Sequence, residues 1–146
     1  MILQIVKYPE PVLEQPGEPI TEFDGELHKL VADLFETMYA SQGIGLAAQQ
    51  VGIPRRVTVV DLSQGKDPAQ KLVFVNPEVI DRAGKQYEDE GCLSFPEIRE
   101  KVARAAKVRV RAQDENGKWF EMDSEELLSR AIQHEIDHLD GILFIF

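Results

Sequence analysis

The pentapeptide HEIDH at residues 134–138 restricts what this chain can fold into more than any other segment. Side chains four positions apart project side by side from a helix, so His134 and His138 could bind one divalent ion at about 2.1 Å. Glu135 is rotated by about 100° from the first histidine, so its carboxylate could lie over the open side of that ion and exchange a proton with water. Such a short motif also arises by chance, and both histidines would then be satisfied by hydrogen bonds in the core.

The residues around the motif favour a metal site over a solvated helix. Both histidines share a helical face with Leu127 and Ala131, which lie seven and three positions before His134. A solvated helix would instead place its histidines among its charged residues. The remaining histidine, His28, does lie among charged residues of an earlier helix, and we expect it to be solvated.

A catalytic site of this kind needs a third protein ligand and a fourth position for water. Cys92 is the candidate, because it is the single cysteine of the chain and lies in EGCLS (90–94), where Gly91 permits a tight backbone. A lone cysteine is more often a small buried hydrophobic residue. A nucleophilic cysteine is a further alternative, although no separate histidine is placed to act as its base.

The remaining pattern predicts an α+β protein. Apolar residues recur three and four apart from about residue 24 to 40, which indicates an amphipathic helix. The glycines of segment 43–52 give its backbone room for unusual torsions or for the close approach of another chain. The last helix is expected to be capped by Asp123 or Ser124 and to end at Gly141. Strands are predicted at 57–60, 72–75 and 108–112, followed by a hairpin turn at 114–117 and a strand at 118–122.

Length, charge and hydropathy limit the class of protein. The 146 residues are expected to form one domain, residues 1–146, with a single sizeable core. No apolar run approaches the roughly 20 residues that cross a bilayer, and the N-terminal segment lacks the positive charge of a signal peptide. We therefore expect a cytoplasmic protein without a membrane partner. The net charge of −10 repels phosphate backbones, so nucleic acid is not expected as a direct substrate.

Three segments together carry a family resemblance. GIGLAAQQ (43–50), EGCLS (90–94) and HEIDH (134–138) resemble the signature motifs of peptide deformylases, and the similarity covers the chain nearly from end to end. The resemblance implies a central HExxH metal-binding helix packed against short, mostly antiparallel sheets. It implies hydrolytic removal of the formyl group from the N-terminal formylmethionine of nascent polypeptides, which releases formate. The implied cofactor is one divalent ion, Fe²⁺ in the native enzyme and Zn²⁺, Ni²⁺ or Co²⁺ after purification.

The resemblance also implies roles for individual residues in the reaction. Glu135 would be the general acid and base. Gln50 would donate its side-chain amide to the developing oxyanion, together with the backbone N–H of Leu93. The metal ligands would be Cys92, His134 and His138.

Substrate binding is implied by the same resemblance. Gly43, Ile44 and Gly45 would pair with the substrate backbone as an added strand, a mode that reads many nascent chains without selecting their side chains. Gly91 and Arg99 would lie near the bound peptide.

A methionine pocket and a buried ion pair complete the implied site. Arg130 departs from a wholly apolar pocket, and we expect its aliphatic stem to form the wall while its guanidinium reaches solvent. Glu90 would pair with Arg104 behind the metal ion. The pocket would be lined by Ile44, Leu93, Arg130, Ala131 and His134.

Two other classes of protein share some of these features. Zinc peptidases contain the same helical motif but commonly take their third ligand downstream, and the eight residues after His138 contain no His, Glu or Cys. A structural metal site or a peptide-binding module would need neither Glu135 nor Gln50.

The end of the sequence differs from that of many family members. The chain stops at Phe146, where many members continue into a further helix or tail, so we expect a short form that lacks this extension. The tail helps some members to dock on the ribosome, and the resemblance therefore implies at most a transient ribosome contact. We expect a monomer.

Overall fold

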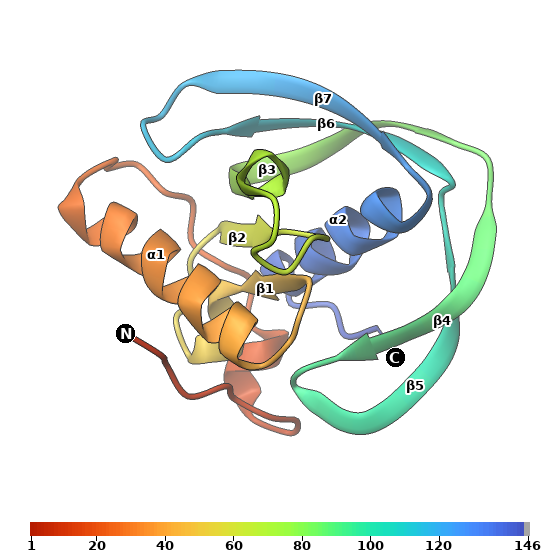
Figure 1. The fold of residues 1–146 in the computed structure, drawn as a ribbon, viewed down its shortest axis with the longest axis horizontal. Coiled ribbons are helices and arrows are strands. Elements are labelled where there is room, and N and C mark those ends of the chain that lie inside the picture. The colour runs from red at the N-terminus through yellow and green to blue at the C-terminus, as the bar shows by residue number, and fades with distance from the viewer. Residues whose placement is uncertain (145–146) are drawn as a thin grey trace.

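A computed structural model describes residues 1–144 of the chain, apart from the side chain of Glu97. Residues 145–146, the end of the predicted domain, lie outside the described residues. Figure 1 shows α2 (Glu126–Leu139) near the middle of the molecule, with α1 (Gly25–Ala40) on one side of it and a two-stranded hairpin on the other. Neither of these helices is long and apolar enough to cross a membrane.

Antiparallel strands of the described residues form two separate sheets. The larger sheet has the order β1-β2-β3-β6-β7, and β4 pairs only with β5. This arrangement around a central helix confirms the predicted α+β class. Short 3-10 helices are η1 (Pro11–Glu14), η2 (Ala48–Val51) and η3 (Pro68–Gln70). The strands are β1 (Gly45–Ala47), β2 (Val57–Val60), β3 (Leu72–Ala83), β4 (Gln86–Cys92), β5 (Phe95–Arg104), β6 (Lys107–Gln113) and β7 (Trp119–Glu125).

Strand β2 separates the two helices and is buried on both faces. Val57 and Val59 belong to the apolar cluster around α1, whereas Val60 belongs to the cluster around α2. Thr58 also faces α2, because its hydroxyl contacts a side chain of that helix. The alternation places α1 and α2 on opposite faces of the same strand. As predicted, α1 begins directly after Asp24, whose carboxylate accepts a hydrogen bond from the backbone N–H of Leu27 at 3.1 Å.

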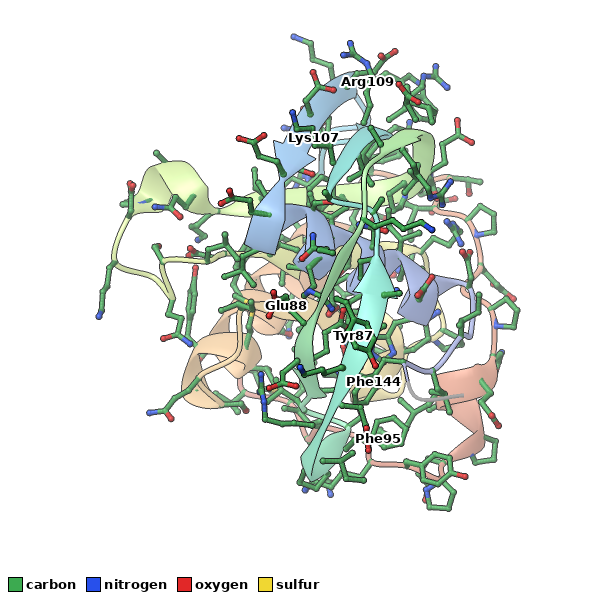
Figure 2. The ribbon with its side chains drawn as sticks, turned by 90° about the vertical axis from the view of Figure 1, so that its right-hand side faces the viewer. Tyr87, Glu88, Phe95, Lys107, Arg109 and Phe144 are labelled. Carbon is green, nitrogen blue, oxygen red and sulfur yellow. The ribbon has the colours of Figure 1, made fainter. Side chains whose placement is uncertain are left out.

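The β4–β5 hairpin was not predicted from the sequence. Its first strand, QYEDEGC, is mostly charged or polar, so it lacks the alternation of apolar and polar residues that indicates a half-buried strand. Cys92, which we expected in a turn, instead ends this strand. The far end of the hairpin is fixed by packing of Phe95 against Phe144, whose ring centroids lie 5.3 Å apart and which Figure 2 shows together at one end of the molecule.

The predicted cap of the last helix is wrong. Asp123 and Ser124 lie within β7, where they pair with Arg109 and Val108 of β6. The backbone groups of both residues are therefore used by the sheet. Glu125 is the N-cap of α2 and makes no side-chain capping hydrogen bond.

Candidate metal centre

The three predicted metal ligands lie together in the structure. Cys92 Sγ, at the end of β4, lies 3.3 Å from His138 Nε2, which in turn lies 3.2 Å from His134 Nε2. All three ligand atoms lie within 4.8 Å of one another. Two nitrogen ligands at about 2.1 Å from one tetrahedral ion are about 3.4 Å apart. The spacing and the donor atoms therefore fit a single divalent ion.

The protonation of the two histidines is set by their buried surroundings. Burial lowers the pKa of His134, but its hydrogen bonds with Cys92 and Glu90 outweigh burial and raise the pKa to about 10. Burial and the neighbouring His134 together lower the pKa of His138 well below its ordinary value. His138 is therefore neutral and has a lone pair for a cation, whereas His134 has to release a proton when a cation binds.

Glu90 orients the first histidine ring. Its Oε1 atom lies 2.7 Å from His134 Nδ1, which leaves Nε2 of the ring for the cluster. Burial alone would raise the pKa of Glu90, but hydrogen bonds from Arg104 and His134 lower it to about 2. Glu90 is therefore a carboxylate throughout the neutral range and can only accept hydrogen bonds.

Glu135 lies beside the cluster and is able to hold a proton near neutral pH. Its Oε1 atom is 3.9 Å from His134 Nε2, and burial raises the pKa of its carboxyl group to about 7. The hydroxyl of Thr58 lies 3.3 Å from Glu135 Oε2 and has a shorter contact, 2.8 Å, to the carbonyl of Leu46. Because a hydroxyl has one hydrogen, Thr58 can donate to Leu46 and accept from a protonated Glu135.

Gln50 presents its amide N–H groups to the cluster from η2. Its Oε1 atom accepts a hydrogen bond from the backbone N–H of Ala47 at 3.0 Å, which fixes the orientation of the amide. Its Nε2 atom can then donate to Cys92 Sγ at 3.5 Å and to Ser94 Oγ at 3.4 Å. A preorganised donor of this kind can stabilise a developing negative charge.

A cleft of about 330 Å³ opens onto the cluster. Two glycines allow close approach along its walls. A Cβ atom on Gly45 would lie 3.0–3.1 Å from the carboxyl end of Glu135, and one on Gly91 would lie 2.8 Å from a guanidinium nitrogen of Arg99. The lining includes the residues that were predicted to bind substrate: Gly43, Ile44, Gly45, Gly91, Leu93, Arg99, Arg130, Ala131 and His134.

Comparison with known proteins identifies the family. Residues 2–146 match the family model described as polypeptide deformylase. The chain belongs to the polypeptide deformylase family. Deformylases are metal-dependent hydrolases that remove the formyl group from formylmethionine at the start of nascent peptides, and this is the activity of the chain.

Individual deformylases are similar over nearly the whole chain. The peptide deformylase of Acidobacterium capsulatum is 67% identical over 146 residues, which are 100% of this chain and 86% of the relative. That of Chromobacterium violaceum is 46% identical over 99% of this chain and 85% of the relative. The crystal structure of a deformylase from Legionella pneumophila has a TM-score of 0.95 and 42% identity, covering 99% of this chain and 84% of that one.

Arg130 departs from what the resemblance to deformylases led us to expect. Its guanidinium does not reach solvent, since the residue is only 4% exposed. The Nη1 atom instead donates to Glu90 Oε2, Nη2 donates to the carbonyl of Val102 at 2.8 Å, and Nε donates to Gln86 Oε1 at 3.1 Å. These contacts could not be expected from the sequence, because the hairpin that provides the acceptors was not predicted.

Two further side chains differ from the predicted positions. Leu127 does not share the buried face of the histidines, because it is 52% exposed at the rim of the cleft. His28 is half-buried rather than solvated, and its Nε2 atom lies 2.8 Å from the carbonyl oxygen of Glu115.

Thr58 and Asp137 contact residues of the candidate site, although no role was predicted for either of them. Thr58 contacts the carboxyl group of Glu135, and Asp137 accepts a hydrogen bond from Arg104. A threonine within the buried run VTVV was a usable sign, because a hydroxyl in such a strand needs a partner. Nothing in the local sequence distinguishes Asp137 from a solvated residue.

Proposed function

We propose that Cys92, His134 and His138 hold the divalent ion with which this chain deformylates nascent peptides. The observation that carries this assignment is the convergence of one sulfur and two nitrogen atoms within 4.8 Å, beside a buried carboxyl group. When bound, such an ion supplies Lewis acidity, which polarises a carbonyl group and makes water more acidic. Fe²⁺ is the proposed native ion, and Zn²⁺, Ni²⁺ or Co²⁺ would suit the same donors.

Glu135 is proposed as the group that moves the proton. As a carboxylate it accepts a proton from the water that attacks the formyl carbon, and the C–N bond of the formyl amide then breaks. The same proton passes to the departing amine, which leaves formate and a free N-terminus. Burial raises the pKa of this carboxyl group above its ordinary value, which favours the uptake of a proton from water.

Gln50 and Leu93 are proposed to stabilise the oxyanion that forms during the attack. The amide of Gln50 is already oriented by Ala47, so little reorganisation is needed when the negative charge develops. The backbone N–H of Leu93, which directly follows Cys92, would be the second donor.

The substrate is proposed to bind along β1. This strand ends the five-stranded sheet, so one of its edges can accept a peptide as a further strand between Gly43–Gly45 and Gly91. Arg99 would lie beside that peptide. The methionine side chain would enter the pocket formed by Ile44, Leu93, Ala131, His134 and the stem of Arg130.

We further propose a cytoplasmic monomer with one domain. Formylmethionine is present on chains as they leave the ribosome, so at most a transient contact with the ribosome is needed. The net charge of −10 opposes self-association. Sedimentation at the mass of one chain, 16.5 kDa, would support the monomer, and a larger species would exclude it.

Replacement of the proposed acid and base tests the mechanism directly. In Glu135→Gln the shape of the side chain is kept but its proton transfer is lost, so formate release from a formylmethionyl peptide should fall at least about 10²-fold. Metal content, measured on the same sample, should not change. The matched control is Glu88→Gln, an exposed glutamate on β4 that Figure 2 shows next to Tyr87.

Three outcomes separate the proposal from its rivals. Formate release by the parent and by Glu88→Gln, but not by Glu135→Gln, supports the proposed mechanism. Cleavage within an unformylated peptide would indicate a peptidase. Binding of the formylated peptide without any release of formate would indicate a binding module.

A further inference from the structure

The carboxylate of Glu90 accepts four hydrogen bonds from three side chains. Arg104 donates to both of its oxygen atoms, at 2.8 and 2.9 Å, and His134 lies at 2.7 Å from Oε1. Arg130 also donates to Oε2. Glu90 is only 5% exposed, so water contributes little to its orientation. The position of this carboxylate, and through it the ring of His134, is therefore decided by two arginines.

Arg130 joins the helix to both strands of the hairpin. It lies in α2, yet its other two hydrogen bonds go to Gln86 of β4 and to the carbonyl of Val102 of β5. Each of the three guanidinium nitrogens thus binds a different residue. A lysine in its place could offer only a single ammonium group and could not reach all three acceptors at once.

This bridge matters because the metal ligands come from the two parts that it joins. Cys92 ends β4, whereas His134 and His138 lie on α2, and β4 is not paired with any strand of the five-stranded sheet. The hairpin therefore makes no strand pairs with that sheet and is joined to β3 and β6 only through the short segments 84–85 and 105–106. Arg130 is four residues before His134, so its side chain projects from the same face of the helix as both histidines.

We propose that Arg130 is a positioning residue that holds Cys92 at bonding distance from the two histidines by tying the β4–β5 hairpin to α2. The inference depends on the metal site proposed above. It assigns to Arg130 a task distinct from lining the methionine pocket. Loss of the bridge should allow the sulfur and the nitrogens to separate, which weakens metal binding before any substrate is present.

Metal affinity is the first measurement. Co²⁺ or Zn²⁺ is titrated into metal-free protein in competition with a chelator, for the parent, Arg130→Met and Arg130→Lys. Loss of an outer partner of a metal ligand typically weakens binding about 10–100-fold, and we expect this for Arg130→Met, with a smaller loss for Arg130→Lys. The Co²⁺-loaded Arg130→Met variant should also show weaker visible absorption from the bond between sulfur and Co²⁺ than the Co²⁺-loaded parent does.

The control removes an arginine that forms ion pairs elsewhere. Arg109 bonds to Glu121 and Asp123 on the surface, and Figure 2 shows it at the opposite end of the molecule from Phe95. Arg109→Met should bind metal like the parent. Unfolding of each metal-free variant is measured as well. If Arg130→Met does not fold, the metal affinity of Arg130→Lys is compared with that of the parent instead.

A double-mutant cycle tests whether Arg130 acts through Glu90. In a Glu90→Gln background the carboxylate that Arg130 orients is already lost, so Arg130→Met should weaken metal binding less than it does in the parent. Additive losses would overturn the route through Glu90, and parent-like affinity of Arg130→Met would overturn the positioning role. A parent protein that binds no Co²⁺ or Zn²⁺ would instead refute the metal site on which the inference rests.

Discussion

At the scale of single residues, the proposed chemistry depends on how closely Glu135 is surrounded. Thr58 contacts one of its oxygen atoms from β2, and Gly45 lies against the end of its side chain. No side chain at position 45 separates the carboxyl group from the backbone of β1. The cleft can therefore bring a substrate carbonyl, bound along β1, next to the group that moves the proton.

Gly45→Ala tests this close approach. The added methyl group would lie 3.0–3.1 Å from the carboxyl end of Glu135, which is closer than a relaxed contact allows, so the side chain has to move. A misplacement on the order of 1 Å can cost about 10²-fold in rate, and we expect kcat to fall by up to that factor while metal content is unchanged. The control is Gly25→Ala, because no atom lies within 4 Å of the added group. A parent-like kcat for Gly45→Ala would contradict the argument.

At the scale of elements, the segment after β2 is anchored by one carboxylate. Asp61 is fully buried and accepts hydrogen bonds from Tyr39 of α1 at 2.6 Å, from the backbone and hydroxyl of Ser63, and from the backbone N–H of Gly65. Its own N–H donates to the carbonyl of Ile44 at 2.9 Å. Asp61 therefore links α1, through its carboxylate, to the start of the proposed substrate strand, through its backbone N–H.

The stability contributed by Asp61 should depend on pH. Burial raises its pKa, but hydrogen bonds from Ser63 and Tyr39 outweigh burial and hold the pKa below its ordinary value of 3.8. The stabilisation is therefore complete above about pH 3.8 and is lost as the pH falls through the lower pKa of the folded state. Asp61→Asn should cost about 2 kcal/mol of unfolding free energy at pH 7.

Urea unfolding of the parent and of Asp61→Asn at several pH values measures this difference. The difference should narrow below about pH 3.8, where the carboxylate of the unfolded parent takes up a proton before that of the folded parent. The exposed Asp81 on β3 provides the control, because Asp81→Asn removes a carboxylate without these partners. A difference that stayed constant down to pH 3 would show that charge on Asp61 is not what stabilises the segment.

In the whole molecule, the metal centre lies where the hairpin meets the central helix, beside the hydrogen bonds of Arg130 that join the two. The hairpin carries the sulfur ligand, and the central helix, which packs on the larger sheet, carries the two nitrogen ligands. Figure 1 shows the hairpin and α1 on opposite sides of that helix. An ion bound by all three side chains would add a further link between the hairpin and the central helix.

Removal of the metal should therefore lower the stability of the protein. When the free ion is present at about a hundred times its Kd, binding adds about 2.7 kcal/mol to the free energy of unfolding. Stripping the ion with a chelator should lower the melting temperature, and restoring Zn²⁺ or Co²⁺ should reverse the change. Cys92→Ala should show a much smaller response. An equal melting temperature for metal-loaded and metal-free parent would count against the proposed site.

Features that depend on neighbouring residues could be predicted from the sequence alone. The spacing within HEIDH brings His134 and His138 onto one face of any helix, and the apolar period from about residue 24 to 40 predicted α1. The turn at 114–117 and the strands beside it were also predicted. These features are local, because the backbone geometry of a helix, turn or strand is set by residues a few positions apart.

Only the tertiary structure decided which distant segments meet. The approach of Cys92 to the two histidines and the burial of Arg130 depend on contacts between residues more than 25 positions apart, and the charged strand β4 forms through its pairing with β5. The free energy of such a contact depends on burial and on the partners available in the folded chain. The residues next to an arginine in the sequence therefore do not decide whether its side chain is solvated or forms a buried bridge.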